Sequence, residues 1–330
     1  MMYYSFIIPV YNRPEEIREL LNSMCDLNFD STFEIVIVED GSTLEAADVV
    51  KEFSQLQISY YKKPNSGPGD SRNFGMRRAK GNYFIILDSD CLLPPHYLSV
   101  VDRMLKASPI DFFGGPDAAH QSFTPLQKAI NYVMTSFFTT GGIRGGSKAI
   151  QRFEPRSFNM GISKNAFEKS GGFGKIHPGE DPDLTQRLWK MGFKSAMIKD
   201  AFVYHKRRIS WGKFYHQVKK FGLVRPILNL WHPESAKLTF WFPSLFMLGT
   251  LFSVILSFLN PLFILPLVCY LIAVLVDSSI KNQNLYIGFL SLIALFVQFF
   301  GYGAAYIKSF VAIHLFGKDP KERFPFLFFE

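Results

Sequence analysis

The chain has 330 residues, of which 48% are hydrophobic and 16% aromatic, and its formal net charge is +8. That composition is rich for a purely soluble protein. The cysteines, Cys25, Cys91 and Cys269, lie far apart and are odd in number, which argues against a disulfide framework or a zinc cluster and fits a reducing cytosol. Residues 1–12 have no basic region and no small-residue cleavage site, so we expect no signal peptide.

The first 200 residues alternate between strand-like and helix-like segments. The predicted strands are residues 4–12, 33–42, 58–63 and 82–88. The predicted helices are residues 15–25, 46–55 and 71–79, and the first has apolar residues at 17, 20, 21 and 24. This alternation predicts an α/β fold with a doubly wound, mostly parallel sheet. The nearly continuous hydrophobicity of the strands fits a sheet that is covered on both faces.

Polar residues occur at the ends of three of the predicted strands. They are the pairs Tyr11-Asn12 and Glu39-Asp40 and the triplet Asp88–Asp90. A lone residue of this kind is more often part of a turn or a helix cap. Open parallel sheets bind ligands beyond the carboxyl ends of their strands, however, and three polar strand ends on one edge favour a binding site.

The triplet Asp88–Asp90 indicates what this site binds. Two carboxylates so close together repel each other, and one of them tends to take up a proton. A divalent cation removes the conflict, since Mg²⁺ or Mn²⁺ is commonly shared between carboxylates and substrate phosphates. The pair therefore suggests a metal–diphosphate site, although short acidic triplets are also common in loops.

The later part of the chain predicts membrane spans. Residues 239–276 form an uncharged run of 38 residues. One helix of that length would reach roughly 57 Å, against a hydrocarbon core of about 30 Å. Divided at Asn260-Pro261, the run makes two spans, and a third uncharged run follows. The predicted spans are residues 239–259, 261–277 and 285–307. Buried core helices are the alternative, but these are usually shorter and polar on one side.

The number of spans stays open at this point. Residues 285–316 would be roughly 48 Å long as one helix, too long for one crossing and too short for two. Gly301 and Gly303 could break that helix. Three spans with an interfacial end, or four spans, are both compatible with the sequence.

Residues 205–238 form a basic segment directly before the first span. Glu234 is its one acid, so it carries about +7, nearly the whole excess charge of the chain. Its basic residues are Lys206, Arg207, Arg208, Lys213, Lys219, Lys220, Arg225 and Lys237. Aromatic residues lie among these cations, which suits amphipathic helices on an anionic membrane surface rather than binding of nucleic acid. Because short basic flanks stay in the cytoplasm, we expect residues 1–238 to be cytoplasmic.

Several motifs, in the right order, resemble those of the family 2 glycosyltransferases, which have the GT-A fold. They are FIIPVYN (6–12), IVIVEDGS (35–42), NSGPGDSRNFG (65–75), LDSD (87–90), GGF (171–173) with GEDPDLTQRL (179–188), and VYHKRR (203–208). Glu39 stands where the family usually has Asp, and Ser71 where Ala is usual. The resemblance covers about residues 4–210, and the combination of motifs is highly specific.

The resemblance implies roles for individual residues. The residues implied in nucleotide-sugar binding are Pro9, Tyr11, Asn12, Asp40, Arg72 and Asp88, with Asp40 accepting hydrogen bonds from the base. Asp90, together with Asp88 and His205, would hold Mg²⁺ or Mn²⁺. For Arg72 the alternative is a salt bridge on a helix surface, and a lone histidine such as His205 is more often structural.

The resemblance singles out Asp181 as the catalytic base, which removes a proton from the acceptor hydroxyl. Asp181 lies in a group of three acids before a helix predicted at residues 184–190. Acids in that position can also simply complement the helix dipole. Glu180 and Arg144 are candidates for contacts with the acceptor or a phosphate, and Arg144 lies in a glycine-rich loop at residues 139–153.

Together these features predict a membrane-bound inverting glycosyltransferase of the bacterial inner membrane. It would transfer one sugar from a nucleotide sugar, with UDP the expected nucleotide, to a lipid-linked or otherwise membrane-associated acceptor. The predicted parts are a catalytic domain (1–204), a juxtamembrane segment (205–238) and a transmembrane region (239–330). The sequence leaves the donor sugar and the acceptor open.

Two alternatives remain. The first is a processive polysaccharide synthase, disfavoured because Gln186 is followed by Arg187-Leu188-Trp189 and not by the pattern Q-x-x-R-W. The second is an inactive nucleotide-binding scaffold, disfavoured because Asp90 and Asp181 are both present.

Overall fold

The computed structural model describes residues 2–118, 123–140, 153–205 and 210–329. These residues form two compact units, and each is described by itself. The first unit contains residues 2–118, 153–205 and 328–329, and the second contains residues 123–140 and 210–327. Residues 123–140, which the sequence analysis assigns to the catalytic domain, therefore cluster with the later helices.

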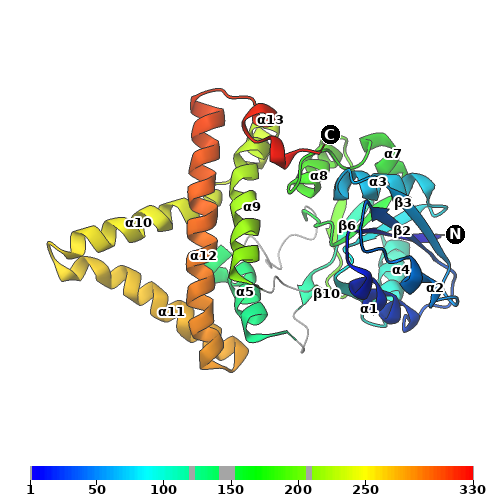
Figure 1. Cartoon of the computed structure of the whole chain (residues 1–330), viewed down its shortest axis with the longest axis horizontal. Helices are drawn as coiled ribbons and strands as arrows, with labels where there is room; N and C mark the ends of the chain where they lie inside the picture. The colour runs from blue at the N-terminus through cyan, green and yellow to red at the C-terminus, as the bar shows by residue number, and fades with distance from the viewer. Residues whose placement is uncertain (1, 119–122, 141–152, 206–209, 330) are drawn as a thin grey trace. The chain divides into compact units, whose positions relative to one another are not determined.

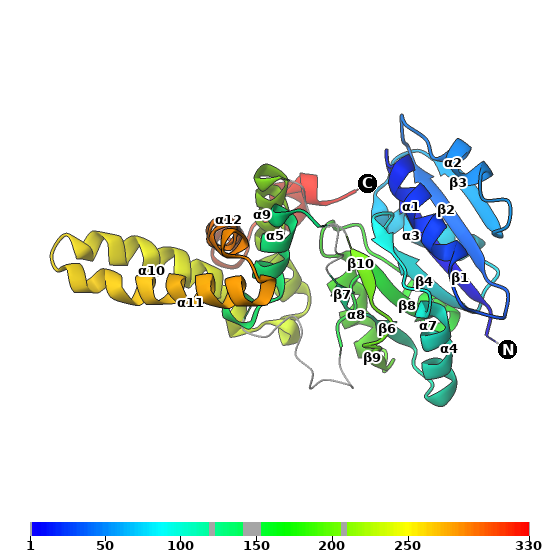
Figure 2. The ribbon, with the colours of Figure 1, turned by 90° about the horizontal axis from the view of Figure 1, so that it is seen from below.

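The first unit is built around a seven-stranded sheet of order β3-β2-β1-β4-β8-β6-β9 (Figures 1 and 2). Its neighbouring strands are parallel except where β8 lies between β4 and β6. The strands are β1 (Tyr4–Val10), β2 (Glu34–Asp40), β3 (Ile58–Lys63), β4 (Tyr83–Leu87), β6 (Phe112–Gly114), β8 (Asn159–Ser163) and β9 (Ser195–Met197). The predicted α/β fold with a mostly parallel sheet is confirmed.

Helices cover both faces of this sheet. Alternate residues of β1 point to opposite faces: Phe6 and Ile8 belong to a core with Leu20 of α1, whereas Ile7 belongs to a core with Met76 of α3. The helices of this unit are α1 (Pro14–Cys25), α2 (Ala47–Lys51), α3 (Pro68–Arg78), α4 (Tyr97–Ala107), α7 (Lys164–Ser170) and α8 (Glu180–Lys190). The continuous apolar runs of the strands follow from this double coverage.

Helix α8 begins four residues earlier than the sequence analysis predicts. Gly179, with φ +120°, turns the chain immediately before it. Pro182 falls in the first turn, where a missing backbone N–H breaks no helical hydrogen bond. Glu180, Asp181 and Asp183 therefore lie inside the first turn of α8 and not ahead of it.

The second unit consists of helices, and the longest, α12, packs along α9 and contacts α5 (Figure 1). Its helices are α5 (Pro125–Thr135), α6 (Phe137–Thr140), α9 (Trp211–Trp231), α10 (Phe242–Ser257), α11 (Leu265–Asn282), α12 (Leu285–Phe310) and α13 (Pro320–Arg323). Three stretches are long and apolar enough to cross a membrane: Leu238–Ser257, Pro261–Asn282 and Leu285–Leu315. These match the predicted spans in place, but the second and third extend further.

Gly301 and Gly303 do not break α12, contrary to the sequence-based suggestion. A side chain at Gly301 would lie 2.9 Å from Val218 of α9, and one at Gly303 would lie 2.8 Å from the carbonyl oxygen of Pro243. These glycines let neighbouring helices approach closely, as small residues commonly do between apolar helices. The helix stays continuous because the glycines serve packing rather than a turn.

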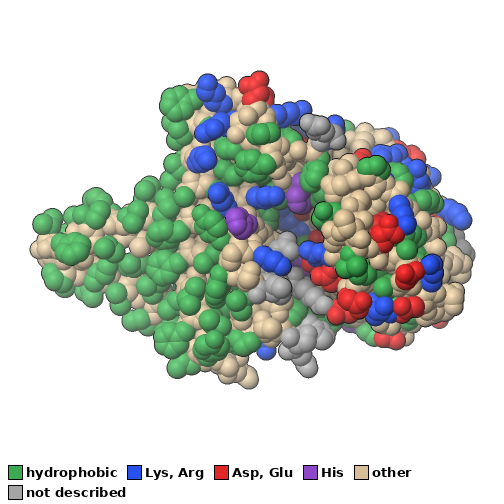
Figure 3. Space-filling model, viewed as in Figure 1, with side chains coloured by type: hydrophobic (Ala, Val, Ile, Leu, Met, Phe, Trp, Pro, Cys, Tyr) green, Lys and Arg blue, Asp and Glu red, His purple; other side chains and the backbone are tan. Residues whose placement is uncertain are grey.

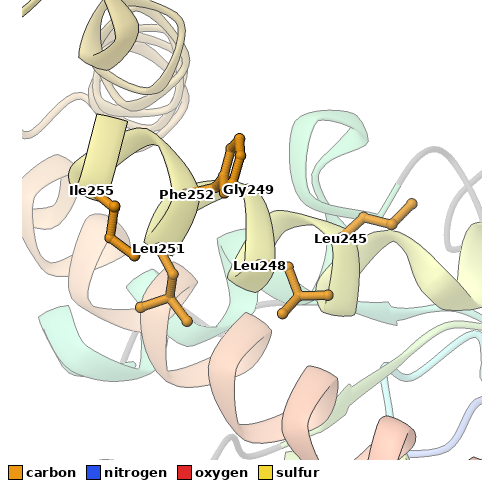
Figure 4. Close-up of a pocket in the computed structure, with 6 residues that line it drawn as sticks. All are labelled: Leu245, Leu248, Gly249, Leu251, Phe252 and Ile255. Carbon is orange, nitrogen blue, oxygen red and sulfur yellow. The ribbon is translucent and has the colours of Figure 1, made fainter. Parts of the chain in front are cut away.

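Helices α10 and α11 project together away from the α9–α12 pair (Figures 1 and 2). Their surface is hydrophobic on the face seen in Figure 3. Figure 4 shows a shallow apolar pocket on α10, lined by Leu245, Leu248, Gly249, Leu251, Phe252 and Ile255. The lining has no titratable group, and its apolar side chains are exposed, which is typical of a helix that faces lipid.

Candidate active site

The carboxyl end of β2 is tied to the loop that leads into α3. The side chain of Asp40 is buried. Its Oδ1 accepts hydrogen bonds from Nζ of Lys63 (2.6 Å) and from the N–H of Ser66 (3.0 Å), and its Oδ2 accepts one from the N–H of Gly67 (3.0 Å). Asp40 thus fixes the conformation of residues 66–67, and its contact with a nucleotide base stays a prediction.

Asn12 connects two of the strand ends. It has a φ of +54°, and its Oδ1 accepts hydrogen bonds from the N–H groups of Thr43 (2.8 Å) and Leu44 (2.9 Å). The neighbouring Tyr11 is 53% exposed, so its ring is available to a ligand. Pro9 is half-buried in β1. Pro9, Tyr11 and Asn12 are all predicted to line the nucleotide pocket. Asn12 has a structural function as well, because it holds the loop after β2.

Glu39 faces away from Asp40, because successive side chains of a strand alternate between faces. Its Oε2 accepts hydrogen bonds from the N–H of Ala46 (2.9 Å) and the hydroxyl of Tyr60 (2.7 Å). The hydroxyl of Ser42 also donates to its carboxylate. Glu39 therefore has a local structural function in holding the start of α2 against β3.

Arg72 joins the end of β4 to α8. Its guanidinium donates from Nη2 to Oδ1 of Asp88 (2.7 Å) and from Nη1 to Oε1 of Glu180 (3.0 Å). The residue is only 3% exposed, which excludes the alternative of a salt bridge on a helix surface. Although burial lowers it, the two carboxylates raise the pKa of Arg72, so the side chain stays charged.

Glu180 and Asp181 are adjacent acids with opposite electrostatic environments. Burial raises the pKa of Asp181 to about 6, and the charge of Glu180 adds to the effect. For Glu180, the favourable interactions with His177 and Arg72 outweigh burial and lower the pKa to about 2. Oδ2 of Asp181 accepts a hydrogen bond from the N–H of Ser157 (3.2 Å). Two neighbouring carboxyl groups with separated pKa values are a common basis for assigning acid–base roles.

A short three-stranded sheet brings His205 next to Asp90. Strand β10 (Val203–His205) lies between β5 (Cys91–Leu92) and β7 (Asp117–Ala118), and its pairing sets His205 opposite Cys91. As a result, Nε2 of His205 lies 3.1 Å from Oδ1 of Asp90. The ring of Phe158 stacks on the imidazole with centroids 4.6 Å apart and limits its rotation.

Asp90, Cys91 and His205 could hold a metal ion, because one ligand atom from each lies within 4.8 Å of the others. Nδ1 of His205 is buried and has no hydrogen-bond partner among the described residues. The carboxylate suits Mg²⁺ or Mn²⁺, whereas an imidazole ligand is more typical of transition-metal ions. Burial raises the pKa of the Cys91 thiol well above its usual value, which makes it a poor third ligand. Oδ1 of Asp88 accepts a hydrogen bond from Arg72, and its predicted share in the metal site stays a prediction.

The structure adds charged residues that the sequence analysis missed. Nη1 of Arg13 donates to Oδ2 of Asp90 (2.9 Å), and Nδ1 of His177 lies 3.0 Å from Oε1 of Glu180. Lys63, which donates to Asp40, was missed as well. Arg13 directly follows Asn12, and Lys63 ends β3, so inspecting one more residue after β1 and one more strand end would have found Arg13 and Lys63. The sequence carried no such signal for His177. Arg144, predicted to contact the acceptor or a phosphate, lies outside the described residues.

The comparisons with known proteins agree on a family. The model of the family described as "Glycosyl transferase family 2" matches residues 5–171, about half of the chain. The chain is 37% identical over 94 residues to the poly(ribitol-phosphate) beta-N-acetylglucosaminyltransferase TarS of Staphylococcus aureus (strain Mu50 / ATCC 700699), a match that covers 27% of this chain and 16% of TarS. It is 26% identical over 223 residues to the probable glycosyltransferase YdaM of Bacillus subtilis (strain 168), covering 64% of this chain and 53% of YdaM.

The chain thus spans about half or less of the length of these curated relatives. Among solved structures, the mannosyltransferase PcManGT from Pyrobaculum calidifontis, in complex with GDP-Man and Mn2+, matches with a TM-score of 0.56 and 16% identity over 96% of this chain and 88% of that one. At that identity the match is one of fold, and it agrees with the expected GT-A architecture. The family match and the GT-A fold together show that the chain belongs to glycosyl transferase family 2.

Proposed function

We propose that the chain is a metal-dependent, inverting glycosyltransferase that transfers a single sugar from a nucleotide sugar, with UDP the expected nucleotide, to a lipid-linked acceptor. Membership of glycosyl transferase family 2 supports sugar transfer. The name of TarS, an N-acetylglucosaminyltransferase, and the GDP-Man and Mn2+ bound to PcManGT support a nucleotide-sugar donor and a divalent metal.

The observation that carries this proposal is the position of Arg72 between Asp88 and Glu180. One buried guanidinium connects the end of the predicted metal-site strand with the first turn of α8, where Asp181 is the next residue. Direct displacement requires that the donor and the base be held in a constant geometry. The buried ion pairs supply such a support without depending on flexible surface side chains.

In this mechanism Asp181 acts as the general base. With a pKa of about 6 it is mostly ionised near neutral pH and still basic enough to take the proton of an acceptor hydroxyl. Such proton removal during attack typically contributes ~10²–10⁴-fold to the rate. The acceptor oxygen attacks the anomeric carbon opposite the departing diphosphate, which inverts that centre. Glu180 stays ionised and holds Arg72 in place.

Asp90 and His205 would hold the cation, and a bound Mg²⁺ or Mn²⁺ supplies positive charge that stabilises the departing nucleoside diphosphate. Arg13 contacts Asp90 from the loop after β1 and adds a further positive charge on the same side. Basic side chains near the diphosphate would act together with the cation in stabilising that charge.

The second unit supports a membrane location for the reaction. Three apolar stretches of spanning length occur among the described residues, and they follow α9, which carries exposed lysines such as Lys213 and Lys219. We infer that the catalytic unit lies on the cytoplasmic side of the bacterial inner membrane, against an anionic lipid surface. This location would allow direct access to an acceptor carried by a membrane lipid.

The test uses the full chain in detergent or lipid nanodiscs. Each of a panel of UDP- and GDP-sugars is supplied with and without Mn²⁺, and release of the nucleoside diphosphate is measured. We expect metal-dependent release from at least one donor. Asp181→Asn should retain donor binding and lose most of the transfer, whereas Glu168→Gln, an exposed acid on α7, should behave like the parent chain.

Three outcomes would contradict parts of this proposal. Failure of the parent chain to bind or cleave any donor would reject the enzyme and favour the scaffold alternative. Turnover near the parent level in Asp181→Asn would reject Asp181 as the base. An acceptor that gains many sugars, resolved by mass spectrometry, would replace single transfer by processive synthesis.

A further inference from the structure

Phe328 and Phe329 pack into the first unit, although residues 210–327 belong to the second. Phe328 forms an antiparallel bridge with Ile176, and the N–H of Phe329 donates to the carbonyl oxygen of Lys175 (3.0 Å). The chain therefore returns to the catalytic unit after the helices and adds a short extended segment beside residues 175–176. This stretch lies just ahead of α8.

The ring of Phe329 occupies the space that a side chain at position 67 would need. Gly67 has a φ of +90°, and a Cβ built on it would lie 2.4 Å from Cδ2 of Phe329 and 2.5 Å from Cγ. The ring also lies near the imidazole of His177, with centroids 6.0 Å apart. Position 67 thus requires glycine for two reasons: its φ is positive, and the ring of Phe329 leaves no space for a side chain.

The two neighbours of Phe329 both connect to residues of the candidate active site. The N–H of Gly67 donates to Oδ2 of Asp40, the residue predicted to recognise the base. His177 contacts Glu180, which in turn holds Arg72. The ring of Phe329 therefore contacts Gly67, in the loop that is hydrogen-bonded to Asp40, and His177, in the segment that precedes the predicted catalytic base.

We propose that Phe329 is a positioning residue for the nucleotide-sugar donor, acting through Gly67 on Asp40. The inference rests on the proposed function, because it presumes that Asp40 faces the nucleotide. Hydrogen bonds from Asn65, Ser66 and Gly67 to Asp40 hold one side of the loop at residues 64–67, and the ring of Phe329 packs against the backbone of Gly67. The aromatic ring covers that backbone and restricts it to the conformation in which Gly67 reaches Asp40.

The first experiment compares Phe329→Ala with Phe326→Ala, whose side chain is 60% exposed. In the full chain, we expect Phe329→Ala to raise the donor KM and weaken nucleotide binding by roughly tenfold, a loss within the range of contacting residues. The kcat should change by less than about twofold, since the groups that move the proton are untouched. Phe326→Ala should change neither quantity, and Phe329→Tyr, which keeps the ring, should restore binding.

The second experiment is a double-mutant cycle between positions 67 and 329. Gly67→Ala introduces both backbone strain and the clash with the ring, so it should weaken nucleotide binding strongly in the parent chain. In the Phe329→Ala background the clash is gone and only the strain remains, so the same substitution should cost several-fold less. The unfolding midpoint of the four proteins provides a readout that is independent of turnover.

The outcomes separate the inference from the proposed function. If the parent chain binds no nucleotide, the proposed function fails and the inference fails with it. If the parent binds nucleotide but Phe329→Ala binds equally well, or if the two substitutions act additively, only the inference is overturned. Should Phe329→Ala fail to fold, Phe329→Leu, which keeps an apolar side chain without the ring, replaces it in both experiments.

Discussion

The two units of the chain are held together by different kinds of interaction. In the first unit, buried ions such as Arg72 and Asp40 hold strand ends and loops together. In the second, α12 meets its neighbours through glycines, with Gly222 and Gly303 in contact with backbone atoms of other helices. Removal of a charge should therefore damage the first unit most, and addition of volume should damage the second.

The largest effect on stability is expected for Arg72→Met. The substitution keeps an apolar stem and leaves Asp88 and Glu180 without their shared partner. Breaking a buried pair in this way costs about 3–5 kcal/mol. Arg77→Met on the same helix is the control: Arg77 is about half exposed and lies 3.8 Å from Asp70, so its loss should cost less than ~1 kcal/mol. Chemical unfolding of the three proteins measures both, and equal losses would contradict the comparison.

A smaller loss is expected for Gly303→Ala in α12. The added methyl would lie 2.8 Å from the carbonyl oxygen of Pro243, and such overpacking typically costs about 1–3 kcal/mol. Gly249→Ala on α10 adds the same methyl to a helix where nothing lies within 4 Å. That control should be neutral or slightly stabilising, because alanine is the better helix former. Thermal unfolding in detergent tests the pair, and a larger loss at position 249 would show that α10 is packed rather than exposed.

The smallest effect concerns pH and involves the first unit alone. Because the pKa of Asp181 is raised to about 6, its ionised form decreases as the pH falls below that value. If Asp181 is the base, kcat/KM should fall about tenfold per pH unit below pH 6. Nucleotide binding measured over the same range should decrease less steeply. A rate that stays level down to pH 5 would mean that a group with a lower pKa removes the proton.

Local patterns in the sequence were sufficient for the first four large strands and for the three apolar helices. Apolar runs predicted β1 to β4, and β3 matches its predicted residues 58–63. Charge-free lengths located the three apolar helices, and polar strand ends indicated Asp40, Asp88 and Asp90, whose roles stay predictions. These features could be predicted because hydrophobic period, turn chemistry and span length each depend on residues that are close in the chain.

The contacts that give the site its geometry were decided by the tertiary structure. Arg72 reaches a glutamate 108 positions away, and Phe329 lies against Gly67 across most of the chain. His205 meets Asp90 only because β10 pairs with β5. Likewise, the difference between exposed α10 and packed α12 depends on which neighbour covers each helix, although both are about equally apolar in sequence. No local pattern encodes such pairings, because they follow from the path of the whole chain and from the burial that this path imposes.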